Sequence, residues 1–302
     1  MGPRFFRDEE LMVTVHAYAK INLTLEVLGR RADGRHEVAT ILQEVGLRDT
    51  LSIEEQRGLS LHCDRPELCS PQNLAYRAAR LLQQEAGIER GASISIEKGI
   101  PVAAGLGGGS SDAAATLRAL NEVWHLGLAR HELEALAAGI GSDVSFFLHG
   151  GTALAEGHGE EVSPLPSPPP SWIVLLVPPL SVPEQKTAQL YAALDSSHFS
   201  SGQVTHSVAA HLRERGELPW SSLYNCFDTV AFTAFPGLER YWEHLRDLGA
   251  EQVHLCGSGP ALFTQARGRD HGEELHRSLQ GEGLEAYLVP TMERDRGQWP
   301  TS

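Results

Sequence analysis

A glycine-rich segment that leads into a helix-forming segment is the strongest constraint on the fold of this chain. Four of the five residues 105–109 are glycine, and residues 110–112 (SSD) follow. The next residues are rich in alanine and leucine, with Leu117, Leu120 and Trp124 at helical spacing. We therefore predict a glycine loop that leads into the N-terminus of a helix.

The glycine loop is suited to binding an anion. Glycines lack a Cβ atom, so backbone N–H groups can approach a ligand closely, and the N-terminus of the next helix attracts negative charge. The residues also allow a flexible turn in which Ser110, Ser111 or Asp112 caps the helix. The density of glycines directly before a helix favours a phosphate site over a simple turn.

Two common phosphate loops do not fit the sequence. A Walker A loop ends in Gly-Lys-Ser or Gly-Lys-Thr, and neither triplet occurs in the chain. The dinucleotide fingerprint has Gly or Ala where Ser110 stands and follows the first strand of a βαβ unit. This loop instead comes about a third of the way along the chain, after an alternating segment at 93–97. The sequence therefore predicts another kind of nucleotide-binding loop and disfavours a nucleotide-dependent dehydrogenase.

The composition limits the partners of the protein. A chain of 302 residues has room for two domains, and its formal net charge of −14 disfavours nucleic acid and anionic membranes as partners. The N-terminus has no apolar segment, and the longest apolar run, 172–177, is too short to span a bilayer. The four cysteines lack C-x-x-C spacing and the histidines lack an H-E-x-x-H pattern, so free thiols are expected and no protein-built metal centre is indicated. We expect a cytoplasmic protein, a monomer or a homodimer, that acts on small molecules.

Two polar side chains lie within a predicted strand. Apolar residues alternate with polar or small ones over 12–27, which predicts one long strand or two in succession. Lys20 and Asn22 lie there between apolar neighbours. A lone strand lysine is ordinarily exposed, but its apolar neighbours also allow a buried functional lysine. Further strands are predicted over 38–45, 50–54 and 59–63, and a helix over 72–86.

Arg35 and His36 belong to a basic turn in an acidic chain. The turn at 29–37 (GRRADGRHE) contains the strong turn signal Asp33-Gly34. It is either a solvated hairpin tip or a loop that reaches over a ligand.

Asp143 precedes an apolar segment, 144–148 (VSFFL), and lies between glycine-rich turns. An aspartate in this position could be the N-cap of a helix. A carboxylate held against an apolar wall could equally be a positioned base. The residues alone leave both interpretations open.

A proline-rich segment, 164–171 (PLPSPPPS), is the predicted boundary between domains at 1–165 and 171–302. Beyond it, the patterns predict a strand at 172–177, helices, two strands joined by the turn 257–260, a helix and a final strand at 285–289. This order is typical of the ferredoxin-like split βαβ arrangement. The chain is therefore predicted to be an α+β protein.

Taken together, these stretches resemble the family of small-molecule kinases that includes galactokinase, homoserine kinase and mevalonate kinase. The resemblance covers most of the chain and is carried by 17–38 (AYAKINLTLEVLGRRADGRHEV), 101–114 (PVAAGLGGGSSDAA), 141–160 (GSDVSFFLHGGTALAEGHGE), 225–228 (NCFD) and 254–263 (HLCGSGPALF). It implies an N-terminal domain like ribosomal protein S5, a C-terminal ferredoxin-like domain, and phosphorylation of a small-molecule alcohol by ATP with Mg²⁺.

The resemblance also implies roles for individual residues. Lys20 and Asp143 correspond to the catalytic pair, and Asn22 to a contact with the acceptor substrate. The ATP-binding residues are Pro101, Val102, Ala103, Ala104, Gly105, Leu106, Gly107, Gly108, Gly109, Ser110 and Ser111. The sequence does not name the Mg²⁺ ligands, for which Ser110 and Ser111 are candidates. The turn 257–260 is expected to help close the site.

Within that family, the likeness is greatest to members whose acceptor carries a cytidine diphosphate group. It places cytosine recognition at His36, with Tyr191 as an aromatic stacking partner. The residue before His36 is usually a tyrosine in such members and is Arg35 here, whose guanidinium can also stack on a base. The alternatives are a relative with another acceptor, such as homoserine, mevalonate or a sugar, and a catalytically silent ligand sensor on the same fold.

Overall fold

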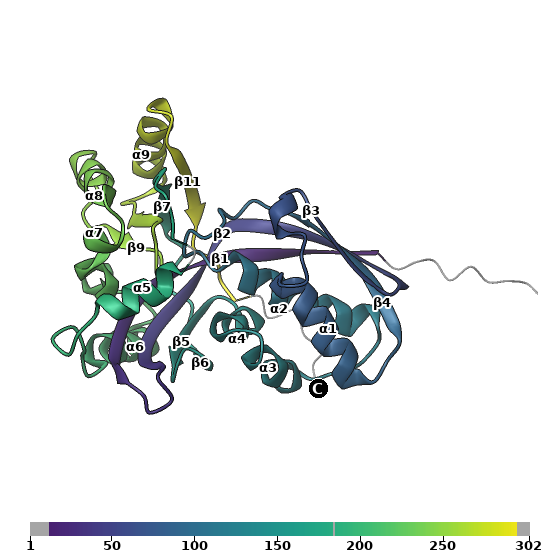
Figure 1. Ribbon diagram of the computed structural model, residues 1–302. Helices are drawn as coiled ribbons and strands as arrows, with labels where there is room; N and C mark the ends of the chain where they lie inside the picture. Colours follow the sequence, from purple (N-terminus) through teal and green to yellow (C-terminus); the bar gives the residue numbers. More distant parts are fainter. Residues whose placement is uncertain (1–11, 184, 295–302) are drawn as a thin grey trace, which may run out of the picture.

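The structure, a computed structural model, describes residues 12–183 and 185–294. It is an α+β arrangement in which two sheets are flanked by helices (Figure 1). The described part of the chain contains no helix that is long and apolar enough to cross a membrane. All four cysteines are free thiols, as predicted.

A long antiparallel hairpin of β1 (Met12–Arg30) and β2 (His36–Arg57) dominates the first sheet and runs through both parts of the molecule (Figure 1). The order of the sheet is β3-β4-β2-β1-β8, and β5 pairs with β2 and β6. The remaining strands are β3 (Leu59–Cys63), β4 (Arg90–Glu97), β5 (Thr152–Glu156), β6 (Glu161–Pro164) and β8 (Tyr224–Asn225). The segment 12–27 is thus one strand, and the predicted strands 38–45 and 50–54 are parts of the single strand β2.

Helices α1, α2 and α4 pack against the first sheet, and α3 packs against these helices (Figure 1, lower right). They are α1 (Leu74–Ala86), α2 (Gly108–Val123), α3 (Arg130–Ala138) and α4 (Ser142–His149). Their apolar faces form a core with the sheet in which Trp124, Phe146 and Phe147 are large buried side chains. Helix α2 begins at the glycine loop, as predicted, and its burial on several sides fixes the position of that loop.

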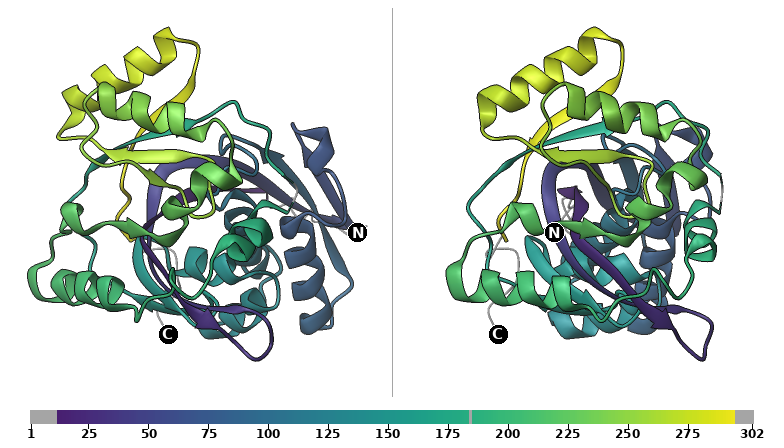
Figure 2. Two further views of the ribbon diagram at one scale, coloured as in Figure 1. Left: turned by 60° about the vertical axis from the view of Figure 1, so that its left-hand side comes forward. Right: turned by 90° about the vertical axis from the view of Figure 1, so that its left-hand side faces the viewer.

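The second sheet is antiparallel and has the order β11-β7-β10-β9. Its strands are β7 (Trp172–Val177), β9 (His254–Leu255), β10 (Leu262–Gln265) and β11 (Glu285–Pro290). The helices of this part are α5 (Lys186–Ala193), α6 (Gln203–Arg215), α7 (Ala231–Ala234), α8 (Leu238–Asp247) and α9 (Arg269–Gly281), and short 3-10 helices lie at Pro66–Leu68, Trp220–Ser222 and Cys226–Thr229. Figure 2 shows α8 and α9 on the outer side of this sheet. The predicted order of strands and helices after residue 171 is confirmed for this sheet and its helices, whereas the short strand β8, which joins the first sheet, was not predicted.

The two sheets share a core. Ile21 and Leu23 of β1 pack in one apolar cluster with Leu175 of β7 and Phe263 of β10. Strand β8 pairs in parallel with β1, so a segment from the C-terminal half completes the first sheet. Because β1 is covered on both faces, its polar residues Lys20 and Asn22 are buried too.

Candidate active site

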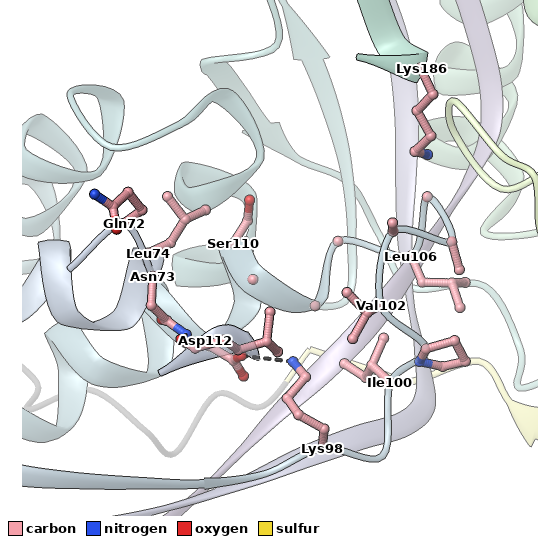
Figure 3. A pocket seen from close by; sticks show the side chains of 18 residues that line it. Gln72, Asn73, Leu74, Lys98, Ile100, Val102, Leu106, Ser110, Asp112 and Lys186 are labelled. Atoms are coloured by element: carbon pink, nitrogen blue, oxygen red, sulfur yellow. Dashed lines mark hydrogen bonds and ion pairs between the residues drawn. The ribbon is translucent and has the colours of Figure 1, made fainter. Parts of the chain in front are cut away.

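A cavity of about 350 Å³ lies over the glycine loop, between the two parts of the molecule (Figure 3). The residues that line it are Leu68, Gln72, Asn73, Leu74, Lys98, Ile100 to Ser110, Asp112 and Lys186. Pro101 to Ser110, which the sequence predicts to bind ATP, all belong to this lining. Ser111, predicted with them, is buried at the start of α2.

The glycines of the loop allow two close approaches. Gly105 has φ +89°, and a Cβ there would lie 2.0 Å from the carbonyl oxygen of Cys256. Gly107 has φ +77°, and a Cβ there would lie 2.9 Å from the ring of Phe147. Both positions have left-handed backbone conformations that residues with a Cβ rarely adopt. The loop thus needs glycine for its own packing as well as for contact with a ligand.

Replacing Gly105 by alanine is expected to destabilise the fold by about 3 kcal/mol, because strain from φ > 0 adds to the clash with Cys256. Chemical unfolding measures this change. Gly109 is the matched control, since a Cβ there would meet only Leu74 at an ordinary 3.6 Å. The Gly109→Ala variant is expected to unfold close to the wild type, and equal stability of both variants would contradict the close approach at Gly105.

Lys20 and Asp143 lie together beside the loop, although 123 positions separate them in sequence. The ammonium nitrogen Nζ of Lys20 is 3.4 Å from Oδ2 of Asp143 and donates a 2.8 Å hydrogen bond to Oδ1 of Asn22. The Lys20 backbone N–H donates to the carbonyl of Leu106 at 2.9 Å, which joins β1 to the glycine loop. The Asn22 amide in turn donates to Thr40 at 2.8 Å. A buried ammonium is thereby held at a fixed position next to a half-exposed carboxylate.

Asp143 lies in the first turn of α4, after the N-cap residue Gly141. The N-cap interpretation of Asp143 is therefore wrong, because a glycine occupies that position and α4 has no side-chain capping bond. The side chain remains available at the N-terminus of a helix, where the dipole favours a negative charge.

A second cavity, of about 500 Å³, is lined in part by Asp143. Arg35, His36, residues 138–143, His158, Thr187 and Tyr191 line it. The rings of His36 and Tyr191 stack at a centroid distance of 4.4 Å and an interplanar angle of 14°. Burial, and then the charge of Arg30, lower the pKa of His36 below its ordinary value. The structure thus brings the predicted residues His36, Arg35 and Tyr191 into one pocket with Asp143.

Arg35 is directed towards His158 in this pocket. Its guanidinium Nη1 lies 2.8 Å from Nε2 of His158, whose Nδ1 lies 2.9 Å from Oγ of Ser142. Residues 30–35 of the basic turn are exposed to solvent, but Arg35 and His36 also line this pocket.

The turn 257–260 packs directly on the Lys20–Asn22 pair. Gly257 has φ +56°, and a Cβ there would lie 2.7 Å from Nζ of Lys20. The amide of Asn225 donates to the carbonyls of Leu255 and Gly257 at 3.1 and 2.9 Å. Asp228 accepts hydrogen bonds from His254 at 2.7 Å and from the Leu255 backbone at 3.0 Å. The segment 225–228 thus fixes the turn that lies against the site.

Sequence reasoning missed a buried charged cluster below the glycine loop. Nζ of Lys98 contacts carboxylate oxygens of Asp49 and Asp112, the latter at 2.8 Å (Figure 3). Asp49 also accepts hydrogen bonds from the backbone of Gly99 and Ile100, both at 2.8 Å. Burial raises the pKa of Asp112 to about 7, although Lys98 opposes the shift. The three residues come from separate segments of the chain, so no local pattern signals the cluster.

Asp112 is expected to make folding stability depend on pH. Between about pH 4 and pH 7 the folded protein keeps a proton on Asp112 that the unfolded chain, with a pKa near 3.8, has released. The contribution of Asp112 to the free energy of unfolding therefore falls as the pH rises through this window. Urea unfolding of wild type and the Asp112→Asn variant at pH 5 and pH 8 measures the effect. The free energy of unfolding should fall less from pH 5 to pH 8 in the variant than in wild type. An equal fall in both proteins would contradict the raised pKa of Asp112.

The chain is similar to known proteins over nearly its whole length. Residues 73–151 match the family described as GHMP kinases N terminal domain. A 4-diphosphocytidyl-2-C-methyl-D-erythritol kinase from Dehalococcoides mccartyi is 43% identical over 282 residues, which cover 93% of this chain and 99% of that protein. The kinase of the same name from Geobacillus thermodenitrificans is 41% identical, with 92% of this chain and 97% of that protein covered.

The chain is also similar to solved structures of kinases. The crystal structure of a 4-(cytidine 5'-diphospho)-2C-methyl-D-erythritol kinase has a TM-score of 0.78 and 37% identity, and the match covers 92% of this chain and 99% of the other. Homoserine kinase from Cytophaga hutchinsonii has a TM-score of 0.71 at 17% identity, with 98% of this chain and 99% of that chain covered, which shows a shared fold alone. The chain belongs to the 4-diphosphocytidyl-2-C-methyl-D-erythritol kinase family, within the GHMP kinases.

Proposed function

We propose that the protein transfers the terminal phosphoryl group of ATP to the 2-hydroxyl of 4-diphosphocytidyl-2-C-methyl-D-erythritol, a step in isoprenoid precursor synthesis by the non-mevalonate pathway. The names of relatives at about 40% identity over nearly the full length support this activity. The observation that carries the proposal is the Lys20–Asp143 pair. Asp143 lines the cavity of His36 and Tyr191, and Lys20 is hydrogen-bonded through its backbone to Leu106, which lines the glycine-loop cavity. Donor and acceptor bound in these cavities would meet at the pair.

Asp143 is the proposed general base. Phosphoryl transfer has a loose transition state, so catalysis depends mainly on positioning and on stabilising charge. The carboxylate of Asp143 would accept the proton of the attacking hydroxyl, and Lys20 would orient it and stabilise the charge that develops on the phosphoryl oxygens. Asn22 holds the Lys20 ammonium at 2.8 Å and is proposed to contact the acceptor as well.

The glycine-loop cavity is the proposed ATP site. The backbone N–H groups of residues 105–111 and the N-terminus of α2 are suited to the phosphates. Within the described residues, no three His, Cys, Asp or Glu side chains are arranged to hold a metal ion, so Mg²⁺ would depend mainly on phosphate oxygens and water. Ser110 lines the cavity and is the protein oxygen we propose for it (Figure 3). When bound, Mg²⁺ neutralises charge on the phosphates.

The cavity around His36 is the proposed site for the cytidine group. A His36 with a lowered pKa is neutral at pH 7, so its ring offers one donor and one acceptor nitrogen to the edge of a base. Tyr191 supplies a flat aromatic surface beside it. Arg35, held by His158 at 2.8 Å, is proposed to add positive charge near the diphosphate or to stack on the base.

We further propose that residues 1–165 form an S5-like domain and residues 171–302 a ferredoxin-like domain. The strand order β11-β7-β10-β9 supports the second name, since the strands lie in the order fourth, first, third, second. We place the protein in the cytoplasm, as a monomer or a homodimer that acts on small molecules without nucleic acid or membrane partners. The net charge of −14 supports the lack of nucleic-acid binding.

ADP release with MgATP and several acceptors tests the proposal. Turnover is expected with 4-diphosphocytidyl-2-C-methyl-D-erythritol and only background ADP release with homoserine, mevalonate or galactose. Turnover with one of the other alcohols alone would overturn the acceptor assignment but keep the kinase. No turnover with any acceptor would favour a silent ligand sensor, which the presence of both Lys20 and Asp143 disfavours.

A further inference from the structure

The lysines of this chain are confined to the proposed phosphate-transfer site. The chain has 25 lysine and arginine residues in total, of which only Lys20, Lys98 and Lys186 are lysines. Lys98 and Lys186 line the glycine-loop cavity, and Lys20 is bonded to the loop through Leu106. Lysines ordinarily lie on protein surfaces, where arginine serves equally well as a charge. A lysine is required where a compact ammonium must fit a confined space.

Lys186 is the lysine to which the proposed reaction assigns no role. It is the first residue of α5, in the C-terminal half of the chain, and its side chain points across the cavity towards the glycine loop (Figure 3). Its ammonium donates to the carbonyl of Ser258 at 3.3 Å, to the hydroxyl of Ser258 at 3.1 Å, and to the carbonyl of Gly259. Among the described residues, no carboxylate forms an ion pair with it. Its partners are therefore neutral oxygens of the turn that covers the site.

The surroundings of Lys186 disfavour its positive charge. Burial, followed by repulsion from Lys20, lowers the pKa of Lys186 to about 8. Cys256 is also near, but burial raises the pKa of its thiol to about 12, so it is neutral at pH 8. Asp143 on α4 faces Lys20, and Tyr191 on α5 has a pKa raised by burial. The buried ammonium of Lys20 and the partly buried ammonium of Lys186 form a site that an anion would stabilise.

We propose that Lys186 is a phosphate-positioning residue that binds the terminal phosphate of ATP from the side opposite the glycine loop. This inference rests on the proposed ATP site and adds a residue from the C-terminal half to it. The polyphosphate would then be held between the loop with Lys20 on one side and Lys186 with the turn 257–260 on the other.

The proposal predicts that nucleotide binding takes up a proton near pH 8. The phosphate charge would raise the pKa of Lys186, so affinity is strongest below pH 8 and falls as the free protein loses the Lys186 proton above it. The competing explanation is that Lys186 only anchors the turn through Ser258. Thr187 provides a matched control, because its hydroxyl lies 2.9 Å from the same Ser258 hydroxyl but carries no charge.

Calorimetry with Mg²⁺ and the non-hydrolysable analogue AMP-PNP, at pH 7 to 9.5 in buffers of different ionisation enthalpy, tests the proposal. Wild type should take up about half a proton at pH 8 and bind about tenfold more weakly at pH 9.5 than at pH 7. The Lys186→Met variant should bind about tenfold more weakly at pH 7 and lose most of the proton uptake. The Lys186→Arg variant should bind AMP-PNP more tightly than the methionine variant but should also lose the proton uptake. The Thr187→Val variant should retain the proton uptake.

Two results would overturn the proposal: Lys186→Met binding as tightly as wild type at pH 7, or proton uptake that persists in both Lys186 variants. Thermal unfolding checks that each variant is folded, and Lys186→Arg carries the test if the methionine variant does not fold. The assay contains no acceptor, so it is independent of the acceptor assignment. Absence of nucleotide binding by the wild type would instead refute the proposed ATP site, and this inference with it.

Discussion

The Asp143→Asn variant is expected to turn over about 10³-fold more slowly than wild type at saturating substrates. Asparagine has the same shape as aspartate, so the helix start at Gly141 and the second cavity should be unchanged. The amide cannot accept the proton of the attacking hydroxyl, however, and it removes the negative charge that faces Lys20 at 3.4 Å. The effect should therefore appear in kcat rather than in the affinity for MgATP.

Single-turnover ADP formation, together with calorimetric binding of MgATP, separates these two effects. The Asp143→Glu variant is a useful comparison, because it keeps the carboxylate and displaces it by one methylene. It should retain more activity than the asparagine variant and less than wild type. An asparagine variant with more than about a tenth of the wild-type kcat would remove Asp143 from the role of general base.

Replacing Lys20 by methionine is expected to lower kcat by about 10²- to 10³-fold. Methionine fills nearly the same volume in the buried strand but cannot donate to Asn22 or face Asp143. It also cannot stabilise charge on the transferring phosphoryl group. Because the backbone bond from residue 20 to Leu106 does not depend on the side chain, the glycine loop should keep its position.

Lys20→Arg tests whether charge alone is sufficient at this position. The space beside the ammonium is closed by Gly257, where even a Cβ would lie 2.7 Å from Nζ. The larger guanidinium should therefore displace the turn and fail to restore activity. Steady-state kinetics and thermal unfolding of both variants measure these outcomes. Full activity of the arginine variant would contradict a site shaped for an ammonium, and full activity of the methionine variant would exclude Lys20 from catalysis.

The local features of this fold follow well from the sequence, because each depends on neighbouring residues. The glycine loop, the start of α2, strand β7 and the order of the second sheet and its helices were all predicted from patterns of a few residues. The break expected within β2 was wrong for a physical reason. Gly46 and Leu47 have no partners on β1 at a register shift opposite Tyr18 and Ala19, so the strand bulges and continues.

The site is harder to predict from residues alone, because its parts come from distant segments. No periodicity relates Lys20 to Asp143, and the resemblance to a kinase family, rather than the local pattern, indicated the pair. The cluster of Lys98 with Asp49 and Asp112 depends on burial, which a single charge in a sequence does not report. The scarcity of lysine in an arginine-rich chain was the one sequence feature that could have indicated Lys186. It points to the site only once the positions of all three lysines are known.

The Lys20–Asp143 pair is proposed to direct the phosphoryl group of ATP to the 2-hydroxyl of the cytidine-containing acceptor. Phosphorus NMR of the reaction of wild-type protein with MgATP and 4-diphosphocytidyl-2-C-methyl-D-erythritol observes this transfer. We expect a new phosphate monoester that forms in step with ADP while the diphosphate of the acceptor stays intact, and its formation should nearly cease in the Asp143→Asn variant. Inorganic phosphate as the only product, a changed diphosphate, or an equal rate in the variant would contradict it.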